Sequence, residues 1–144
     1  MIEKILSHHK VLNNLYYEKL DKIREEFDFN NQNIYFEEMQ QYATHLKEKI
    51  IYHFSLQEKL KNKINSKVDK IILENMLVKD ILIRMSNKII EGAKNKDITI
   101  FNFFDDFEEI LKAYLKKEEG LFLQELEMAT NKEEKEKIKN ILKD

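Results

Sequence analysis

Six side chains that can bind metals or form hydrogen bonds occupy positions where a helical protein would place apolar residues. They are His9, His53, Gln57, Asn75, Tyr114 and Glu118. Imidazole nitrogens and carboxylate oxygens bind iron and other divalent metals, and a phenolate oxygen can add a ligand for ferric iron. The same groups can instead satisfy one another as a buried hydrogen-bonded network. The pattern therefore leaves a metal site and a metal-free network open.

These side chains would have to come together from distant parts of a helical chain. The sequence has 144 residues, no Pro and two Gly, and 36% of it is charged. This composition favours long amphipathic helices over a sheet with frequent turns. Its length fits one domain that can bury a core without disulfides. We therefore expect a single all-α domain.

Composition also excludes several classes of function. The chain has no Cys, so thiolate metal sites and thiol catalysis are excluded. A net charge of -2 with only two arginines argues against a nucleic-acid partner. No apolar run exceeds three residues, which predicts no membrane-spanning helix and no secretory signal. We expect a cytoplasmic protein.

Apolar residues recur at helical spacing in four long segments. The predicted helices cover 1–27, 34–64, 66–93 and a segment that begins near Thr99. The second stripe alternates steps of three and four residues, as in the seam of a bundle helix. The predicted inward stripes, in helix order, are Ile2, Ile5, His9, Leu12, Tyr16, Ile23 and Phe27; Met39, Ala43, Leu46, Ile50, His53, Gln57, Leu60 and Ile64; Val68, Ile71, Asn75, Val78, Leu82, Met85 and Ile89; Phe104, Phe107, Leu111, Tyr114, Glu118 and Leu121.

The predicted architecture is an up-down-up-down four-helix bundle over 1–128 with a helical extension at 129–144. Ser66 and Asp69 suggest the cap of the third helix, and Thr130 and Glu133 resemble a capping box before a short helix at 131–142. The high charge density of this last helix predicts a solvated appendage.

The polar residues of the four stripes are expected at one level of the bundle. His9 lies 22 residues before Asn31, the centre of the first turn, and His53 lies 22 residues after it. The same count from the later turns places Gln57, Asn75, Tyr114 and Glu118 at that level. His8 and His45 lie off the stripes and are predicted to be solvated.

Enzymatic alternatives based on these residues find little support. No inward Ser accompanies either histidine, as a Ser-His-Asp hydrolase would require. Glu118 is the one inward carboxylate at this level, whereas paired-carboxylate catalysis needs two. We therefore expect a protein that binds rather than catalyses.

Three short motifs resemble those of the hemerythrin family, over residues 5–122. His9 stands in the ligand place of the first-helix motif LSHHK, and His53 in that of the second-helix motif YHFSLQE. The segment YLKKEE, 114–119, is similar to the fourth-helix motif, which ends in acidic residues. The resemblance implies a four-helix bundle that holds non-haem iron and binds O2 or NO.

The sequence departs from the family at three ligand places. Gln57 stands where a bridging Glu is expected, Tyr114 where a His is expected, and the third helix offers Asn75 but no His. The resemblance then implies an iron site with fewer ligands than the family uses. Its ligands would be His9, His53 and Glu118 or Glu119, with Tyr114 as a further ligand. Gln57 and Asn75 would act as neighbours of the ligands. The alternative is a metal-free bundle that acts as a protein interaction module.

Overall fold

The computed structural model describes residues 2–142, apart from the side chains of Ile2 and Ala129. Within that range the chain forms α-, 3-10 and π-helices and no strand, so the all-α prediction is confirmed. Met1, the predicted start of the first helix, and the inward side chain predicted for Ile2 lie outside the described residues.

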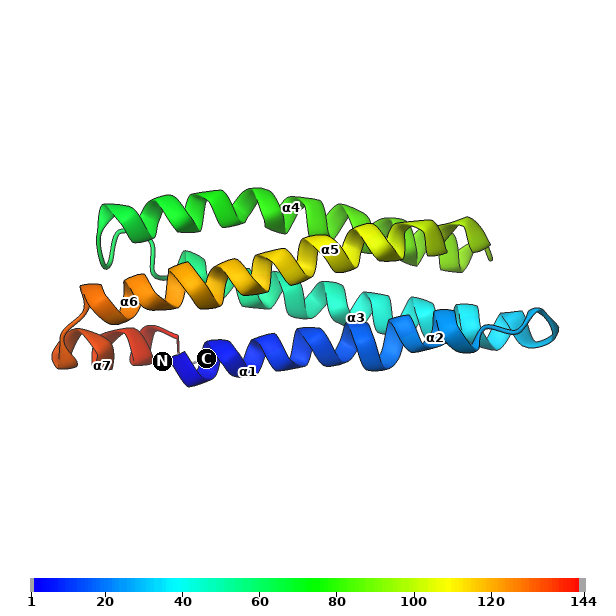
Figure 1. Cartoon of the computed structure of the whole chain (residues 1–144), viewed down its shortest axis with the longest axis horizontal. Helices are drawn as coiled ribbons and strands as arrows, with labels where there is room; N and C mark the ends of the chain where they lie inside the picture. Colours follow the sequence, from blue (N-terminus) through cyan, green and yellow to red (C-terminus); the bar gives the residue numbers. More distant parts are fainter. Residues whose placement is uncertain (1, 143–144) are drawn as a thin grey trace.

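The chain runs along the long axis of the molecule four times (Figure 1). We call these four passes rods 1 to 4. Rod 1 consists of α1 (Ile2–Asn13), the π-helix η1 (Asn14–Leu20) and α2 (Asp21–Glu26); after the 3-10 turn η2 (Phe29–Asn31), rod 2 is α3 (Gln32–Glu58); rod 3 is α4 (Ser66–Lys94); after the 3-10 turn η3 (Ile98–Phe101), rod 4 consists of α5 (Asn102–Lys117), the π-helix η4 (Glu118–Phe122) and α6 (Leu123–Ala129); α7 (Lys132–Ile141) then folds back.

Contacts between the rods favour bundle packing. The second rod packs against rods 1 and 3, and α4 packs against α5. Rods 1 and 4 are joined by a hydrogen bond of 2.8 Å from the Tyr16 hydroxyl to the Phe104 carbonyl, and by an ion pair of 2.8 Å between Arg24 and Asp105. Each rod therefore contacts two others, and residues far apart in sequence come together between them.

Several helices begin or end one to several residues away from their predicted boundaries. Helix α3 ends at Glu58 rather than at 64; residues 59–63 form turns, and Asn62 among them has a left-handed φ of 65° that a right-handed helix cannot accommodate. Asn65, not Ser66, caps α4 by accepting from the Val68 N–H at 2.9 Å. The capping box of α7 is one residue later than predicted, with Asn131 in the capping position.

Two clusters of buried apolar side chains fill the interior. We call the larger one the long cluster; its buried members are Leu12, Leu15, Tyr16, Leu20, Ile23, Phe36, Met39, Ala43, Leu46, Ile50, Phe54, Leu82, Ile89, Ala93, Ile100, Phe104, Phe107, Leu111, Tyr114 and Leu115. We call the other the end cluster; its buried members are Ile5, Leu56, Leu60, Val68, Ile72, Phe122, Leu123, Leu126, Ile138 and Leu142.

Two predicted stripes drift from the observed burial. In α4 the buried positions include Ile72 and Ser86, while the predicted Ile71 and Met85 are only half-buried. In rod 4 Phe122 is fully buried and the predicted Leu121 is 55% exposed. The wider turn of η4 delays the inward position by one residue, because a π-helix has more residues per turn than an α-helix.

The C-terminal helix is part of the packed interior, contrary to its prediction as a solvated appendage. Ile138 and Leu142 are 3% and 2% exposed and belong to the end cluster together with Ile5 and Phe122. These two apolar residues are four apart, so they share the face of α7 that meets the bundle. Figure 1 shows α7 folded back beside the end of rod 4.

No helix in the described part of the chain combines the length and apolarity needed to cross a membrane.

Candidate metal centre

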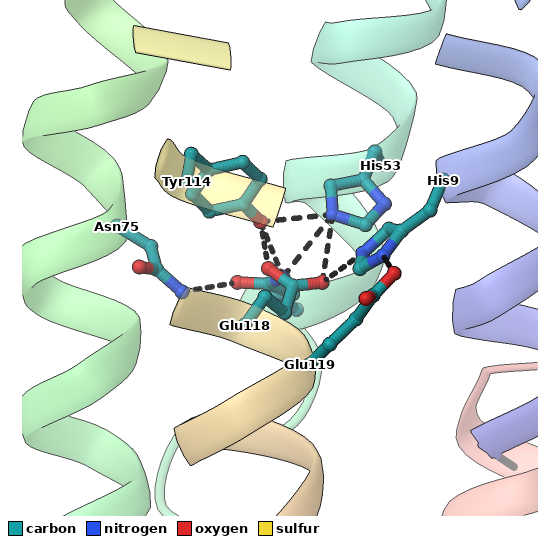
Figure 2. Close-up of polar contacts among 7 residues, drawn as sticks. His9, His53, Asn75, Tyr114, Glu118 and Glu119 are labelled. Carbon is teal, nitrogen blue, oxygen red and sulfur yellow. Dashed lines mark hydrogen bonds and ion pairs between the residues drawn. The ribbon is translucent and has the colours of Figure 1, made fainter. Parts of the chain in front are cut away.

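A layer of polar side chains joins the long cluster to the end cluster. All six residues predicted from the sequence lie in it, and each is 2% or 3% exposed: His9, His53, Gln57, Asn75, Tyr114 and Glu118. Figure 2 shows side chains from all four rods converging on Glu118. We call this set the polar layer. Counting residues from the turn centres predicted that these six residues lie at one level, and in the structure they do lie together.

Helix geometry places each member of the layer. His53 and Gln57 are one turn apart on α3 and therefore share its inner face. Tyr114, near the end of α5, and Glu118, the first residue of η4, are related in the same way on rod 4. The π turn begins at the layer itself, a position where such turns often occur in functional sites.

Glu118 lies between two histidines. Its Oε1 atom is 2.9 Å from His9 Nε2 and 3.0 Å from His53 Nε2. One ligand atom from each of these three buried residues lies within 4.8 Å of the other two. Ligand atoms that share one ion at ~2 Å are about 3 Å apart when they are neighbours in its coordination sphere. The cluster could therefore hold a metal ion.

The second oxygen of Glu118 is hydrogen-bonded within the layer. Oε2 accepts a short hydrogen bond from the Tyr114 hydroxyl and one of 2.6 Å from the Gln57 amide. Asn75 donates in turn to Gln57 Oε1 at 3.0 Å. Donors on two rods therefore fix the orientation of the carboxylate, with Asn75 of a third rod holding Gln57, and Oε1 is left directed at the histidines.

Glu119 gives His9 a second carboxylate partner. The other ring nitrogen of His9, Nδ1, is 2.9 Å from Glu119 Oε1. A carboxylate on the far nitrogen of a histidine fixes its tautomer and directs Nε2 at a metal, as is common for metal-binding histidines. The sequence pointed to Glu118 or Glu119 as alternatives, and the structure gives both a contact with His9. Glu119 is half exposed, which is why its stripe position did not identify it.

Hydrogen bonds control the charges of the layer in the absence of a metal. Burial opposes ionisation of Glu118, but hydrogen bonds with His53 and His9 outweigh it and lower the pKa of Glu118 to about 2. Burial likewise opposes protonation of His9, yet its two carboxylate partners raise the pKa of His9 above 6.5. Burial and the neighbouring Glu118 raise the pKa of Tyr114 well above 10. Tyr114 is therefore a neutral hydrogen-bond donor here.

His53 is crowded at one nitrogen and has no partner at the other. Its Nε2 atom lies 2.9 Å from the Tyr114 hydroxyl, 3.0 Å from Glu118 Oε1 and 3.3 Å from the Gln57 amide. A ring nitrogen makes one hydrogen bond, so these three contacts cannot all be used at once. The buried Nδ1 atom has no hydrogen-bond partner among the described residues. The crowding at Nε2 is compatible with a metal ligand, whereas Nδ1 would need an acceptor if Nε2 bound a metal.

The two remaining histidines behave differently from each other. His45 is exposed on α3, as predicted. His8 is half-buried rather than solvated, and its ring centroid is 5.4 Å from that of Tyr52 and 5.7 Å from that of His53. It approaches the layer from the side of α1, which faces α3, and no residue of the predicted stripe indicated this.

No protein-family model matches the chain, and neither a curated protein nor a solved structure matches it at a significant level.

Proposed function

We propose that the protein is a hemerythrin-like four-helix bundle, of up-down-up-down topology, that binds one non-haem iron ion through His9, His53 and Glu118. The observation that carries the proposal is the position of Glu118 Oε1, which lies 2.9 and 3.0 Å from two imidazole nitrogens in a buried layer. A bound iron would supply a redox-active Lewis acid with coordination positions left open.

The donor set supports iron over several other metals. Two imidazoles and one carboxylate form the set used by non-haem Fe(II) sites, while calcium and magnesium prefer oxygen ligands alone. Three protein ligands from three rods are enough for one ion, and too few for the iron pair of the family that the motifs resemble. The proposed site is therefore mononuclear.

Tyr114, Gln57 and Asn75 would orient the ligands in this proposal. In the metal-free protein the Tyr114 hydroxyl is bound to Glu118 Oε2, and the pKa of Tyr114 is raised by burial and by that carboxylate. A ferric ion would offset both effects, so Tyr114 is also the candidate for a fourth ligand. Glu119 would hold the tautomer of His9.

Binding of O2 or NO follows from the open coordination positions and the resemblance. The walls on the long-cluster side are apolar and include Phe54, whose ring centroid is 4.9 Å from that of Tyr114. A small uncharged gas can enter such surroundings without leaving a polar group unpaired. We therefore propose iron-linked binding or sensing of O2 or NO rather than catalysis.

The alternative is a metal-free bundle that acts as an interaction module. It is favoured by an apolar stripe on α4, where Leu73, Leu77 and Ile81 are 62%, 67% and 42% exposed and follow one another at one-turn intervals. Exposed apolar surface of this kind often marks a binding face. Under this alternative the polar layer is a hydrogen-bonded network and serves the fold alone.

Replacing both layer histidines separates the two functions. The double variant His9→Gln, His53→Gln should bind no stoichiometric Fe(II) under anaerobic titration, and Fe(II) should no longer raise its melting temperature. For the native protein, an ion at 100 times its Kd should stabilise the fold by about 2.7 kcal/mol. The control is His45→Gln, which changes an exposed histidine on the same helix as His53.

Two results would overturn the assignment. A double variant that still holds one iron per chain would show that the ligands lie elsewhere. If the native protein and the His45 variant take up no iron while remaining folded, the interaction module becomes the better function.

A further inference from the structure

The ligand residues of the proposed centre are almost completely buried. All three are 2% exposed. A surface cavity of about 70 Å³ nevertheless lies between α1 and α3, close to His53; it is lined by His8, Val11, Leu12, Lys49 and Tyr52. The His8 ring borders this cavity and also contacts His53, with 5.7 Å between ring centroids. The His8 side chain therefore touches both the cavity and a proposed ligand.

The two histidines of the centre differ on their far sides. His9 Nδ1 has the Glu119 carboxylate as its partner, whereas the buried His53 Nδ1 has none among the described residues. In Figure 2 the Nδ1 edge of His53 is turned towards rod 1, whose α1 contributes three residues to the cavity lining. If Nε2 of His53 binds a metal, Nδ1 must carry the proton, and it becomes a buried donor in need of an acceptor.

The lining of the cavity selects the chemistry of such an acceptor. Lys49 contributes a positive charge, and His8 and Tyr52 contribute polar groups, while no carboxylate borders the cavity. Val11 and Leu12 form apolar walls. A metal ion behind His53 would add further positive charge. These surroundings favour a small anion, and a volume of about 70 Å³ limits it to a few non-hydrogen atoms.

We propose that the cavity between α1 and α3 binds a small monovalent anion that reaches His53 Nδ1 when the His8 side chain turns aside. The anion would accept a hydrogen bond from His53 Nδ1, as the Glu119 carboxylate pairs with His9 Nδ1. This inference rests on the proposed metal site. Partners of this kind change metal affinity by about 10- to 100-fold, and coupling between two sites is reciprocal. The anion would therefore strengthen metal binding, and the metal would strengthen anion binding.

Zinc and nitrate are suitable probes. Zinc has no redox chemistry, and nitrate is small, monovalent and a weak zinc ligand. The Kd for Zn²⁺ is measured by chelator competition with nitrate or with the bulky anion benzenesulfonate at equal ionic strength. Nitrate should lower the Kd about tenfold in the native protein. In Lys49→Met the nitrate effect should fall below about twofold, while the Kd without nitrate stays unchanged.

The matched control is Lys10→Met. Lys10 is an exposed lysine of α1 that lines a different surface cavity, together with Asn13, Asn14, Tyr17 and Glu18. This variant should keep the full nitrate effect. An equal nitrate effect in Lys49→Met and in the native protein would place nitrate on the zinc or elsewhere, and would overturn the proposal. Absence of any nitrate effect in the native protein would overturn it as well.

Failure of the metal site is recognised separately. If the native protein binds no zinc before nitrate is added, the proposed function fails, whatever the cavity does. The ring signals of His8 and His53 in ¹⁵N-histidine NMR spectra then test the cavity in the metal-free protein. Shifts with nitrate that Lys49→Met abolishes would retain the anion site, and unchanged spectra would overturn it.

Discussion

The long cluster and the polar layer each bury a tyrosine, and Tyr114 belongs to both while Tyr16 lies in the long cluster alone. In the long cluster, Tyr16 is fully buried and its hydroxyl donates once, to the Phe104 carbonyl at 2.8 Å. In the polar layer, the Tyr114 hydroxyl contacts a carboxylate, an amide and one histidine, His53. One backbone acceptor is thus enough to bury a phenol in this fold. The six polar side chains of the layer exceed what packing needs, and this excess is the main reason to assign the layer a function.

The largest predicted effect comes from removing the centre of the layer. Glu118→Ala leaves His9 and His53 without their shared buried partner, so the metal-free protein should lose about 3–5 kcal/mol of unfolding free energy. Urea denaturation of the variant and the native protein measures the loss. Glu118→Gln, which keeps the volume and an acceptor, should lose less. A loss below about 1 kcal/mol for the alanine variant would contradict the ionic description of the layer.

The same charges predict how stability of the metal-free protein depends on pH. The folded pKa of Glu118 is about 2, below its ordinary 4.5, so its contribution is present above pH 4.5 and lost as the pH falls towards 2. This contribution is roughly 3 kcal/mol. The folded pKa of His9 is raised above 6.5, so its contribution is present below pH 6.5 and lost as the pH rises through the folded pKa.

Unfolding free energy should therefore be highest between these two losses. Urea denaturation from pH 2 to 9 measures the profile, with Tyr16→Phe as the reference because its change leaves the layer intact. Glu118→Ala should remove the acid slope, because it deletes the group that titrates there, and should reduce the alkaline slope, because Glu119 remains as a partner of His9. If the variant keeps both slopes, other groups cause them.

Paired tyrosine variants test the contrast between the two regions directly. Tyr16→Phe leaves the Phe104 carbonyl without its donor and should cost about 1–2 kcal/mol, with metal affinity unchanged. Tyr114→Phe should cost about as much but also weaken metal binding about tenfold, because the Glu118 carboxylate loses one of the donors that orient it. Urea denaturation and metal titration measure the two effects. Equal metal affinity in both variants would remove Tyr114 from the site.

The two glycines test local packing in the same two regions, and Gly120 gives the smallest predicted effect. A Cβ atom at Gly92 would clash with Ile100 Cγ2, so Gly92→Ala should cost about 1–3 kcal/mol through overpacking in the long cluster. Gly120 lies in the π turn beside the polar layer with nothing within 4 Å of such an atom, so Gly120→Ala should stabilise by about 0.5–1 kcal/mol. Thermal unfolding measures both. A destabilised Gly120→Ala would show that the π turn requires glycine.

Periodicity predicted the helices and the polar layer because both follow from regular spacing. The stripe of the second helix matches the buried face of α3 from Met39 to Gln57, and Leu60 in the turn that follows is also buried. The turn centres were close enough that His9 and His53 were expected at one level, and they meet at Glu118. These features depend on the regular spacing and rise of a helix, so the predicted level is right as long as the turn centres are placed nearly right.

Other features depend on deviations that periodicity does not contain. The π turn at η4 moved the inward position from Leu121 to Phe122, and no residue type in this segment predicts a π turn. The packing of α7 depends on two apolar residues, Ile138 and Leu142. The high charge of the segment predicted a solvated helix and gave no sign of this packing. The contacts of Glu119 and His8 with the layer arise at its margins, where half-exposed side chains reach inwards across a helix interface.

Metal content of the native protein tests the central claim most directly. The untagged protein, purified without chelator from iron-supplemented cells, is analysed by mass spectrometry for metals and by absorption spectroscopy. The account predicts about one iron per chain and its loss in the His9→Gln, His53→Gln variant. A folded native protein that carries no metal, and that binds none on anaerobic addition of Fe(II), would contradict it.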